Sequence, residues 1–220
     1  MDGGNLKRTL KPSIMAAIIL LTFALAFTPS AKAQVAAVSV LPATVDIAAV
    51  GQTQTVDINI TDVTGLFGYE IKIWYANTIV NTTVASVVRP TGHFLEPVLD
   101  PGNQFVPKWQ VDNSFNATHG RIWLSFTLLD PETGRSGSGI LFRITFTGTG
   151  VGSTLIVLAN YPGTDGPVKL AEKSAAAIAH TANNGTINVI PEIMMLLPIF
   201  AVTSLIAVSL AKLRKKKQLQ

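Results

Sequence analysis

Apolar and polar residues alternate with a period of two along most of the chain, and this alternation limits the possible folds more than any other feature. Between residues 34 and 190 no window keeps a 3.6-residue apolar repeat for long. A strand with period-two alternation buries one face and exposes the other. The pattern is clearest at residues 55–61, 68–75, 121–128 and 140–147.

Shorter strands are expected wherever β-branched runs lie between clusters of Gly, Pro, Asn and Asp. These runs lie at residues 35–40, 84–88, 155–158 and 186–190. The longest irregular stretch is expected at residues 89–120, which contain four prolines and act either as a crossover between sheets or as a functional loop. Eight or nine such strands predict an all-β fold, an antiparallel β-sandwich.

The C-terminal end predicts a membrane anchor. Residues 193–211 carry no formal charge, and a basic cluster from Lys212 to Lys217 follows them. A helix of this length is about as long as a bilayer core is thick, at ~1.5 Å rise per residue. The basic flank places residues 212–220 in the cytoplasm as a tail, so residues 191–211 span the membrane and the preceding domain is extracellular. A buried core helix is the alternative, although only the basic tail follows to cover it.

The N-terminal end predicts export. Lys7, Arg8 and Lys11 precede an apolar run at residues 14–27, and Ala31 and Ala33 then supply the small residues of a cleavage site. This order is typical of a signal peptide covering residues 1–33, with cleavage between Ala33 and Gln34. An uncleaved signal anchor is the alternative. In either case residues 34–190 form one exported domain of a single-pass protein at the cell surface.

Composition excludes several classes of function. There is no cysteine, which removes a thiol nucleophile, a cysteine zinc site and an iron–sulfur cluster. The basic residues at the two ends are topology signals, and between residues 34 and 211 the chain has eight bases against twelve acids. No nucleic-acid partner is therefore expected.

No catalytic or metal site is evident from the motifs. His93, His119 and His180 are isolated in the sequence and are expected in surface loops. The loop acids stand beside Pro or Gly, where carboxylates cap turns, and a structural calcium is the alternative use for them. These acids are Asp100, Asp112, Asp130, Glu132 and Asp165. No Gly-x-Ser-x-Gly motif occurs, so no enzyme activity, cofactor or metal is expected.

Strand and glycine-turn motifs follow one another in a characteristic order, at residues 45–47, 51–53, 56–60, 63–75, 120–126, 137–146 and 184–189. This order resembles the cohesin module, a jelly-roll relative of cellulose-binding modules known from cellulosome scaffolds. The resemblance covers nearly the whole exported domain and implies a jelly-roll sandwich that binds a dockerin-like protein. The family usually has an aspartate and a proline directly after the tyrosine that ends the third strand, a corner that commonly contributes to dockerin recognition. Here Ala76 and Asn77 follow Tyr75, which leaves another ligand open.

The C-terminal segment also resembles a sorting signal. Pro191 and Glu192, the apolar span and the basic cluster together are similar to the tripartite signals that archaeal sortase-like transpeptidases cleave. The proline-glutamate-phenylalanine type is the nearest, with Ile193 in the place of phenylalanine. A plain single-span anchor is the alternative.

Glycosylation is expected at four Asn-x-Ser/Thr sequons, which the alternation places on outer strand faces or in loops. They begin at Asn59, Asn81, Asn116 and Asn184. Threonine-rich strands also produce such triplets by chance, which is the alternative explanation.

Two tryptophans are predicted to point away from the core. Trp74 is in phase with the polar positions of its strand, and so is Trp123. The cohesin resemblance implies that their strands are neighbours in the sheet whose outer face binds the partner. Outward aromatic rings suit protein partners or sugar rings, unless a loop or residues 175–179 cover them. The predicted binding face comprises Glu70, Lys72, Trp74, Arg121, Trp123 and Ser125.

Together these features predict a non-enzymatic, membrane-anchored binding or scaffolding module that recruits an extracellular protein, either dockerin-like or a neighbouring surface protein. Two alternatives remain open. One is a carbohydrate-binding module that holds a polysaccharide on the outward tryptophans. The other is a structural, glycosylated envelope protein.

Overall fold

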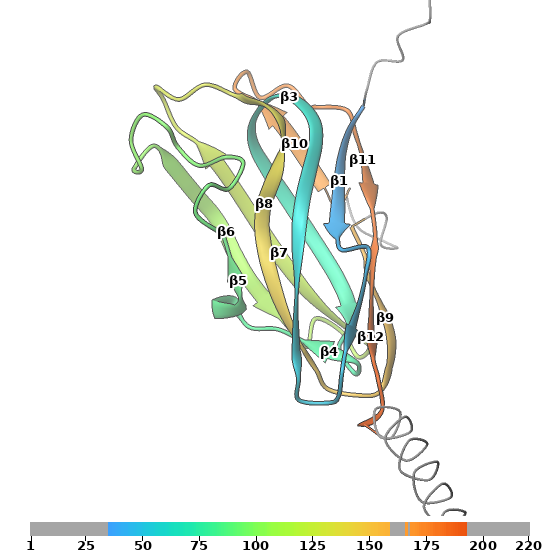
Figure 1. Cartoon of the computed structure of the whole chain (residues 1–220). Helices are drawn as coiled ribbons and strands as arrows, with labels where there is room; N and C mark the ends of the chain where they lie inside the picture. The colour runs from blue at the N-terminus through green and yellow to red at the C-terminus, as the bar shows by residue number, and fades with distance from the viewer. Residues whose placement is uncertain (1–34, 159–165, 167, 193–220) are drawn as a thin grey trace, which may run out of the picture. The chain divides into compact units, whose positions relative to one another are not determined.

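The computed structural model describes residues 35–158, 166 and 168–192, which form a β-sandwich (Figure 1). A short 3-10 turn, η1 (Val84–Ser86), precedes the fifth strand. The strands are β1 (Ala36–Leu41), β2 (Thr44–Ile47), β3 (Thr53–Ala76), β4 (Val80–Asn81), β5 (Val87–Val88), β6 (Gln104–Asp112), β7 (His119–Leu128), β8 (Arg135–Gly148), β9 (Gly152–Ile156), β10 (Val168–Glu172), β11 (His180–Asn183) and β12 (Gly185–Val189).

The long strand β3 joins the two layers of the sandwich. Its first half pairs with β1 and β8, and its second half pairs with β7 and β10. Between the halves the register with β8 shifts, and Asp62 and Gly65 have φ angles of 54° and 67°. Glycine adopts this left-handed region readily and aspartate tolerates it, which lets the strand bend here.

One layer consists of β10, β3, β7 and β6, in that order. The other contains β11, β1, β3 and β8, and β4 and β5 pair with β8. A separate small sheet consists of β2, β12 and β9, in that order. Two pairings are parallel, β1 with β11 and β2 with β12, which corrects the expectation of a wholly antiparallel sandwich. These partners come from opposite ends of the domain, so no hairpin imposes an antiparallel direction on them.

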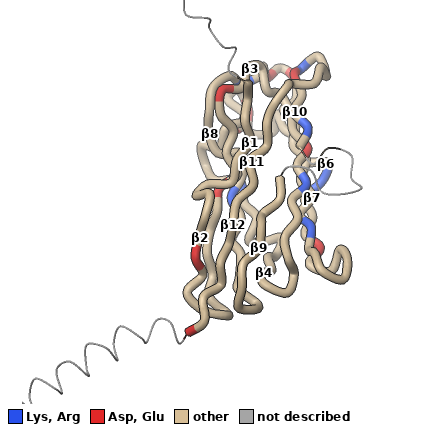
Figure 2. The backbone as a smooth tube through the Cα atoms, turned by 90° about the vertical axis from the view of Figure 1, so that its right-hand side faces the viewer, with Lys and Arg blue, Asp and Glu red and all other residues tan. Residues whose placement is uncertain are grey.

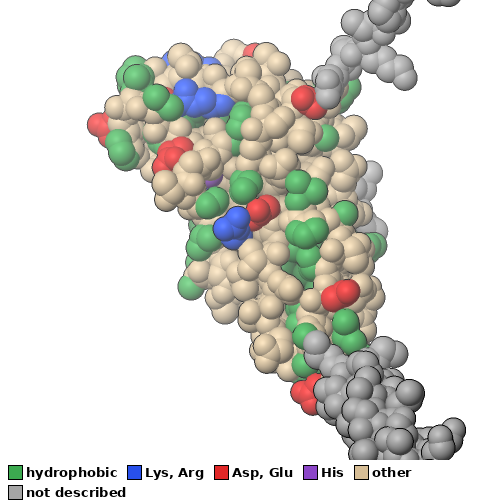
Figure 3. All heavy atoms as spheres, viewed as in Figure 1, with side chains coloured by type: hydrophobic (Ala, Val, Ile, Leu, Met, Phe, Trp, Pro, Cys, Tyr) green, Lys and Arg blue, Asp and Glu red, His purple; other side chains and the backbone are tan. Residues whose placement is uncertain are grey.

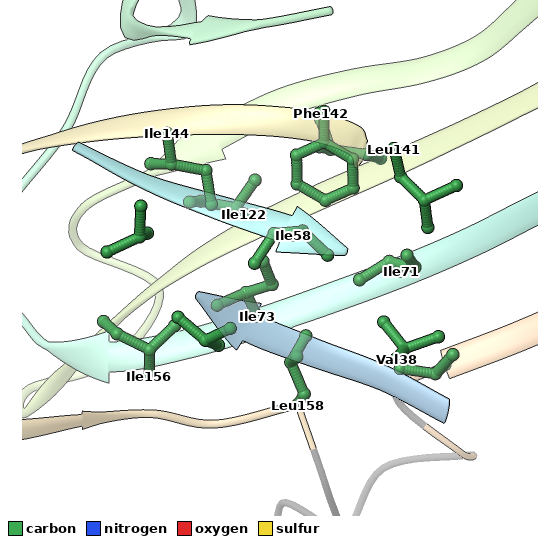
Figure 4. Packing of buried hydrophobic residues seen from close by; sticks show 14 of the residues in the cluster. Val38, Ile58, Ile71, Ile73, Ile122, Leu141, Phe142, Ile144, Ile156 and Leu158 are labelled. Atoms are coloured by element: carbon green, nitrogen blue, oxygen red, sulfur yellow. The ribbon is translucent and has the colours of Figure 1, made fainter. Parts of the chain in front are cut away.

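The core confirms the alternation read from the sequence. In β3, β7 and β8 buried and half-exposed residues alternate over most of the length. Ile58, Ile73, Ile122, Phe142 and Ile144 have no exposed surface and pack between the layers (Figure 4). Burial of these side chains stabilises the sandwich without disulfides, since each contributes about 1.5–3 kcal/mol.

The stretch predicted to be irregular contains a strand. β6 runs antiparallel to β7 within residues 89–120, and its register shifts between Phe105 and Lys108, where Pro107 lies. Proline cannot donate to the ladder and is tolerated at a bulge of an edge strand, which is where this one lies. Residues 84–88, predicted to be a strand, form η1 and the two-residue β5.

In the described ranges, no helix is long and apolar enough to cross a membrane. The predicted signal peptide, residues 193–211 of the predicted anchor and the predicted tail lie outside these ranges, and so does the predicted cleavage site at Ala33 and Gln34. Pro191 and Glu192 are the last two residues described.

Candidate functional site

The outer side of the β10–β3–β7–β6 layer carries mostly polar side chains, and we call it the sheet face. The register places Glu70 opposite Ser125 and Lys72 opposite Trp123. β6 adds Lys108 beside Ser125 and β10 adds Lys169 beside Glu70. The sheet face comprises Glu70, Lys72, Phe105, Lys108, Gln110, Asp112, Arg121, Trp123, Ser125, Thr127 and Lys169.

Five of the six residues predicted for the binding face therefore lie together, and Trp74 is the exception. Its position in β3 is opposite Arg121, as the phase requires, but the side chain has no exposed surface. The backbone of Trp74 also exchanges hydrogen bonds with Val157, which follows β9. Phase fixes the side of a sheet on which a side chain lies, but it does not reveal what covers that side. Trp74 thus lies on the side that its phase predicts, but it is covered there, so the prediction that it forms part of an exposed binding face is wrong.

The residues of β6 and β10 on the sheet face were missed in the sequence. Lys108, Gln110 and Asp112 alternate with Trp109 and Val111, which is a strand signal. The bulge at Pro107 interrupts the period and hides the first half of β6. Trp109 lies on the inner side, where its indole N–H donates to the Val87 carbonyl over 3.1 Å.

Cations converge on the half-buried Trp123 ring. Lys108 Nζ lies 4.7 Å, Lys72 Nζ 4.9 Å and the Arg121 guanidinium carbon 5.3 Å from the ring centroid. Glu70 accepts ion pairs from Lys72 at 3.3 Å and Lys169 at 3.8 Å. The face is thus cationic around an aromatic centre, and Figure 2 shows Lys and Arg along this side of the molecule.

An apolar area adjoins one end of the sheet face. Phe105 is 57% exposed and stands opposite Thr127, and Leu129 is 42% exposed just after β7. In the loop before β6, Val98 and Leu99 are exposed as well. Figure 3 shows apolar side chains gathered at the tip of the molecule that carries these loops. An exposed aromatic beside a polar sheet is suited to serve as a contact anchor.

Glu132 ties the long loop before β6 to the β7–β8 connection. Its carboxylate is 1% exposed, accepts from the Leu99 N–H over 2.7 Å and pairs with Arg135 over 2.8 Å. Burial alone would raise the pKa of Glu132. Hydrogen bonds from backbone N–H groups, including that of Leu99, and from the Asn103 side chain outweigh the effect of burial, so the pKa is lowered. Glu132 is a buried anchor rather than a simple turn cap.

His93 is another correction, because it was expected on the surface and is only 8% exposed. Its ring packs edge-on against Phe126 at 5.6 Å. Burial, followed by the Arg89 charge, lowers the pKa of His93, while Glu96 opposes them. His93, Arg89 and Glu96 line a cavity of about 180 Å³ that the loop between β5 and β6 forms. His119 and His180 are half-buried.

Of the other loop acids, Asp100 and Asp112 cap turns, whereas Asp130 forms an ion pair with Lys173. Asp100 accepts from the Gly102 N–H over 2.7 Å, and Asp112 accepts from the Ser114 N–H over 3.0 Å. Asp165 lies outside the described residues. Over the described part of the chain, no three His or acidic side chains gather in a way that would hold a metal ion.

The four sequons occupy different environments. Asn116 and Asn184 are exposed in the turns after β6 and between β11 and β12. Asn81 is half-buried in β4, and Asn59 is half-buried within β3, where it pairs with Ser39 and Ile140. The turn sites are therefore the most accessible acceptors for a glycan.

Comparison with solved structures shows that the fold is that of cohesin domains. A chain in the crystal structure of the CaDoc0917–CaCohA2 complex matches at 24% identity and a TM-score of 0.51, over 70% of this chain and 99% of that one. The solution structure of CaCohA2 from Clostridium acetobutylicum matches at 23% identity and a TM-score of 0.51, over 73% of this chain and 94% of that one.

The second type II cohesin module of the adaptor ScaA scaffoldin from Acetivibrio cellulolyticus matches at 18% identity and a TM-score of 0.51, over 73% of this chain and 92% of that one. No family model matches the sequence, and neither does any curated protein. The likeness therefore rests on the arrangement of the strands, and it confirms the jelly-roll fold expected from the order of motifs.

Proposed function

We propose that this protein is a non-catalytic binding or scaffolding module that holds an extracellular protein partner on the sheet face. The observation that carries the proposal is the sheet face itself, a polar surface with Trp123 at its centre and the exposed Phe105 at one end. Aromatic anchors within a polar surround are typical of protein-binding surfaces. CaCohA2, whose fold this chain shares, is found in a complex with CaDoc0917, which supports a protein as the ligand.

Glycan binding is the weaker alternative. A polysaccharide site needs aromatic rings side by side, and burial of Trp74 leaves Trp123 without the second ring that the sequence predicted. The neighbours of Trp123 in register are Lys72 and Gln110, which are not aromatic. For this reason we propose a protein, dockerin-like or a neighbouring surface protein, rather than a polysaccharide.

The proposed location is the cell surface, with the module tethered by the C-terminal apolar segment. Its support is the sequence at the two ends of the chain, a signal-peptide pattern at residues 1–33 and a span with a basic flank at residues 191–220. Whether Pro191 and Glu192 mark a plain anchor or a sorting signal, the module faces outward in both cases.

Site-specific photo-cross-linking in intact cells tests the binding face. A photoreactive residue replaces Gln110, which is exposed on the sheet face, or Thr181, which is exposed on β11 in the other layer. We expect a defined protein adduct from position 110, reduced when Trp123→Ala is added, and none from position 181. Adducts from position 181 alone, or adducts at position 110 that persist with Trp123→Ala, would rule out this face.

A further inference from the structure

The bases of the domain are concentrated on the sheet face. Of the eight bases between residues 34 and 211, four lie there, whereas only two of the twelve acids do. The bases are Lys72, Lys108, Arg121 and Lys169 and the acids are Glu70 and Asp112. An acidic domain thus presents one basic face (Figure 2). Such local asymmetry favours partners of the opposite sign.

Two of these cations lack a carboxylate partner within the described residues. Glu70 is engaged by Lys72 and Lys169, but neither Lys108 nor Arg121 takes part in an ion pair. Asp112 stands opposite Arg121 in register, but its carboxylate accepts from the Ser114 N–H. The Arg121 guanidinium instead lies 4.1 Å from the centroid of the Phe115 ring.

Both cations are held at Trp123, together with Lys72. Three like charges within about 5 Å of one ring centroid repel one another, and the face of a single indole offsets this only in part. The indole N–H of Trp123 is buried and, among the described residues, has no hydrogen-bond partner. A buried donor without a partner, beside two unpaired cations, marks a place that the chain itself does not complete.

We propose that the segment docked on the sheet face is acidic, and that one of its carboxylates sits between Lys108 and Arg121 beside Trp123. This inference rests on the proposed function and names the chemistry of its partner. Charge-assisted hydrogen bonds from an ammonium and a guanidinium are the strong contacts such a carboxylate makes. Phe105, at the end of the same face, provides the apolar contact that a protein segment uses and a simple anion does not.

Peptide binding to the purified full-length chain in detergent tests the proposal. The probe is a glutamate-rich peptide, and a glutamine-rich peptide of equal length is the neutral comparison. We expect the glutamate peptide to bind, to shift the indole N–H resonance of Trp123 and to weaken steeply when the salt concentration rises. The double variant Lys108→Gln with Arg121→Gln should bind at least about tenfold more weakly, since two charge-assisted contacts are lost.

A matched control removes the same charge elsewhere. Arg143→Gln with Lys173→Gln also loses two positive charges, from residues that pair with Asp57 and Asp130. Arg143 lies on β8 in the other layer, and Lys173 lies just after the end of β10, outside the residues of the sheet face. This control should keep the affinity within about twofold of the unchanged chain, because distant exposed charges are largely screened.

Three results would overturn the acidic-partner inference. They are equal binding of both peptides, equal losses of peptide affinity in the two double variants, and binding of an acidic polysaccharide without binding of the glutamate peptide. The proposed function fails separately, when the cross-link from position 110 is absent. A cross-link that survives Lys108→Gln with Arg121→Gln would mean that the face binds a protein but not through these charges.

Discussion

Trp74 and Trp123 occupy equivalent polar-phase positions on neighbouring strands, and yet the structure gives them opposite environments. Trp74 has no exposed surface, whereas Trp123 is half-buried beneath three cations. The difference decides which ring contributes to stability and which is available to a partner. Only Trp123 belongs to the sheet face.

The two tryptophans should therefore differ when each is replaced by alanine. Trp74→Ala leaves a cavity, and we expect it to lower the free energy of unfolding by about 3–5 kcal/mol. Trp123→Ala removes a ring that is only half-buried, so the loss in the free energy of unfolding should be closer to about 1 kcal/mol. Equilibrium unfolding in urea measures both losses. Equal losses would contradict the assignment of Trp74 to the interior and Trp123 to the binding face.

At the scale of elements, the loop between β5 and β6 is held by a few polar anchors rather than by regular pairing. Glu132, in the connection between β7 and β8, accepts hydrogen bonds from loop N–H groups. The Arg89 guanidinium carbon lies 4.6 Å from the centroid of the Phe126 ring, and Arg89 donates to the Gln104 side chain over 2.5 Å. This anchoring holds the part of the loop that carries the exposed Val98 and Leu99. The shape of the apolar end of the sheet face therefore depends on the ionised state of Glu132.

Acid should loosen this loop before the sandwich unfolds. The pKa of Glu132 is lowered in the fold from its usual value of 4.5, so its stabilising contribution is complete above that pH. It is lost as the pH falls through the lowered pKa, because the protonated carboxyl is a weaker acceptor. The amide resonance of Leu99 followed during an acid titration reports the change.

Glu132→Gln is the control for that titration. It keeps the shape of the side chain but removes the charge, so the loop should be looser at neutral pH. The Leu99 amide resonance of this variant should no longer change as the pH falls below 4.5. If the same step remains in this variant, another acid controls the loop.

At the scale of the whole molecule, the domain is a cohesin-type sandwich whose charges are divided between a basic sheet face and an acidic remainder. The sequence at both ends predicts that this sandwich is presented outside the cell. The chain leaves β12 at Val189 and reaches Pro191 and Glu192 directly, so a short connector precedes the predicted span.

Protease added to intact cells should remove the sandwich and leave the basic tail protected. The reason is the positive charge after residue 211, which predicts that this end stays in the cytoplasm. Immunodetection of the domain and of the tail measures the outcome, and the released domain should begin at Gln34. A domain that resists protease until the cells are lysed would refute the predicted orientation.

Glycans provide an independent readout of the same orientation. Asn116 and Asn184 are exposed in turns, so we expect them to be occupied more fully than Asn59, which is half-buried in a central strand. Intact mass before and after Asn116→Gln and Asn184→Gln measures the occupancy. The mass of the bare polypeptide in native material would contradict the predicted glycans.

The sequence by itself determined the strands, because alternation is a local property that a pleated strand converts directly into an inner and an outer face. Ile58, Ile73, Ile122 and Phe142 could be assigned to the core in this way. The order of the strand and turn motifs was sufficient to identify the cohesin fold. It also placed Lys72 and Trp123 on one face, because their strands were expected to be neighbours.

Only the tertiary structure decided what covers each face and which distant residues meet there. Burial of Trp74, the position of β6 beyond the bulge at Pro107 and the approach of Lys108 to Trp123 all depend on contacts between segments far apart in the chain. Such contacts leave no periodic signal in the sequence. They arise from the packing of the whole sandwich, which is why the charge of the sheet face became visible only in the folded molecule.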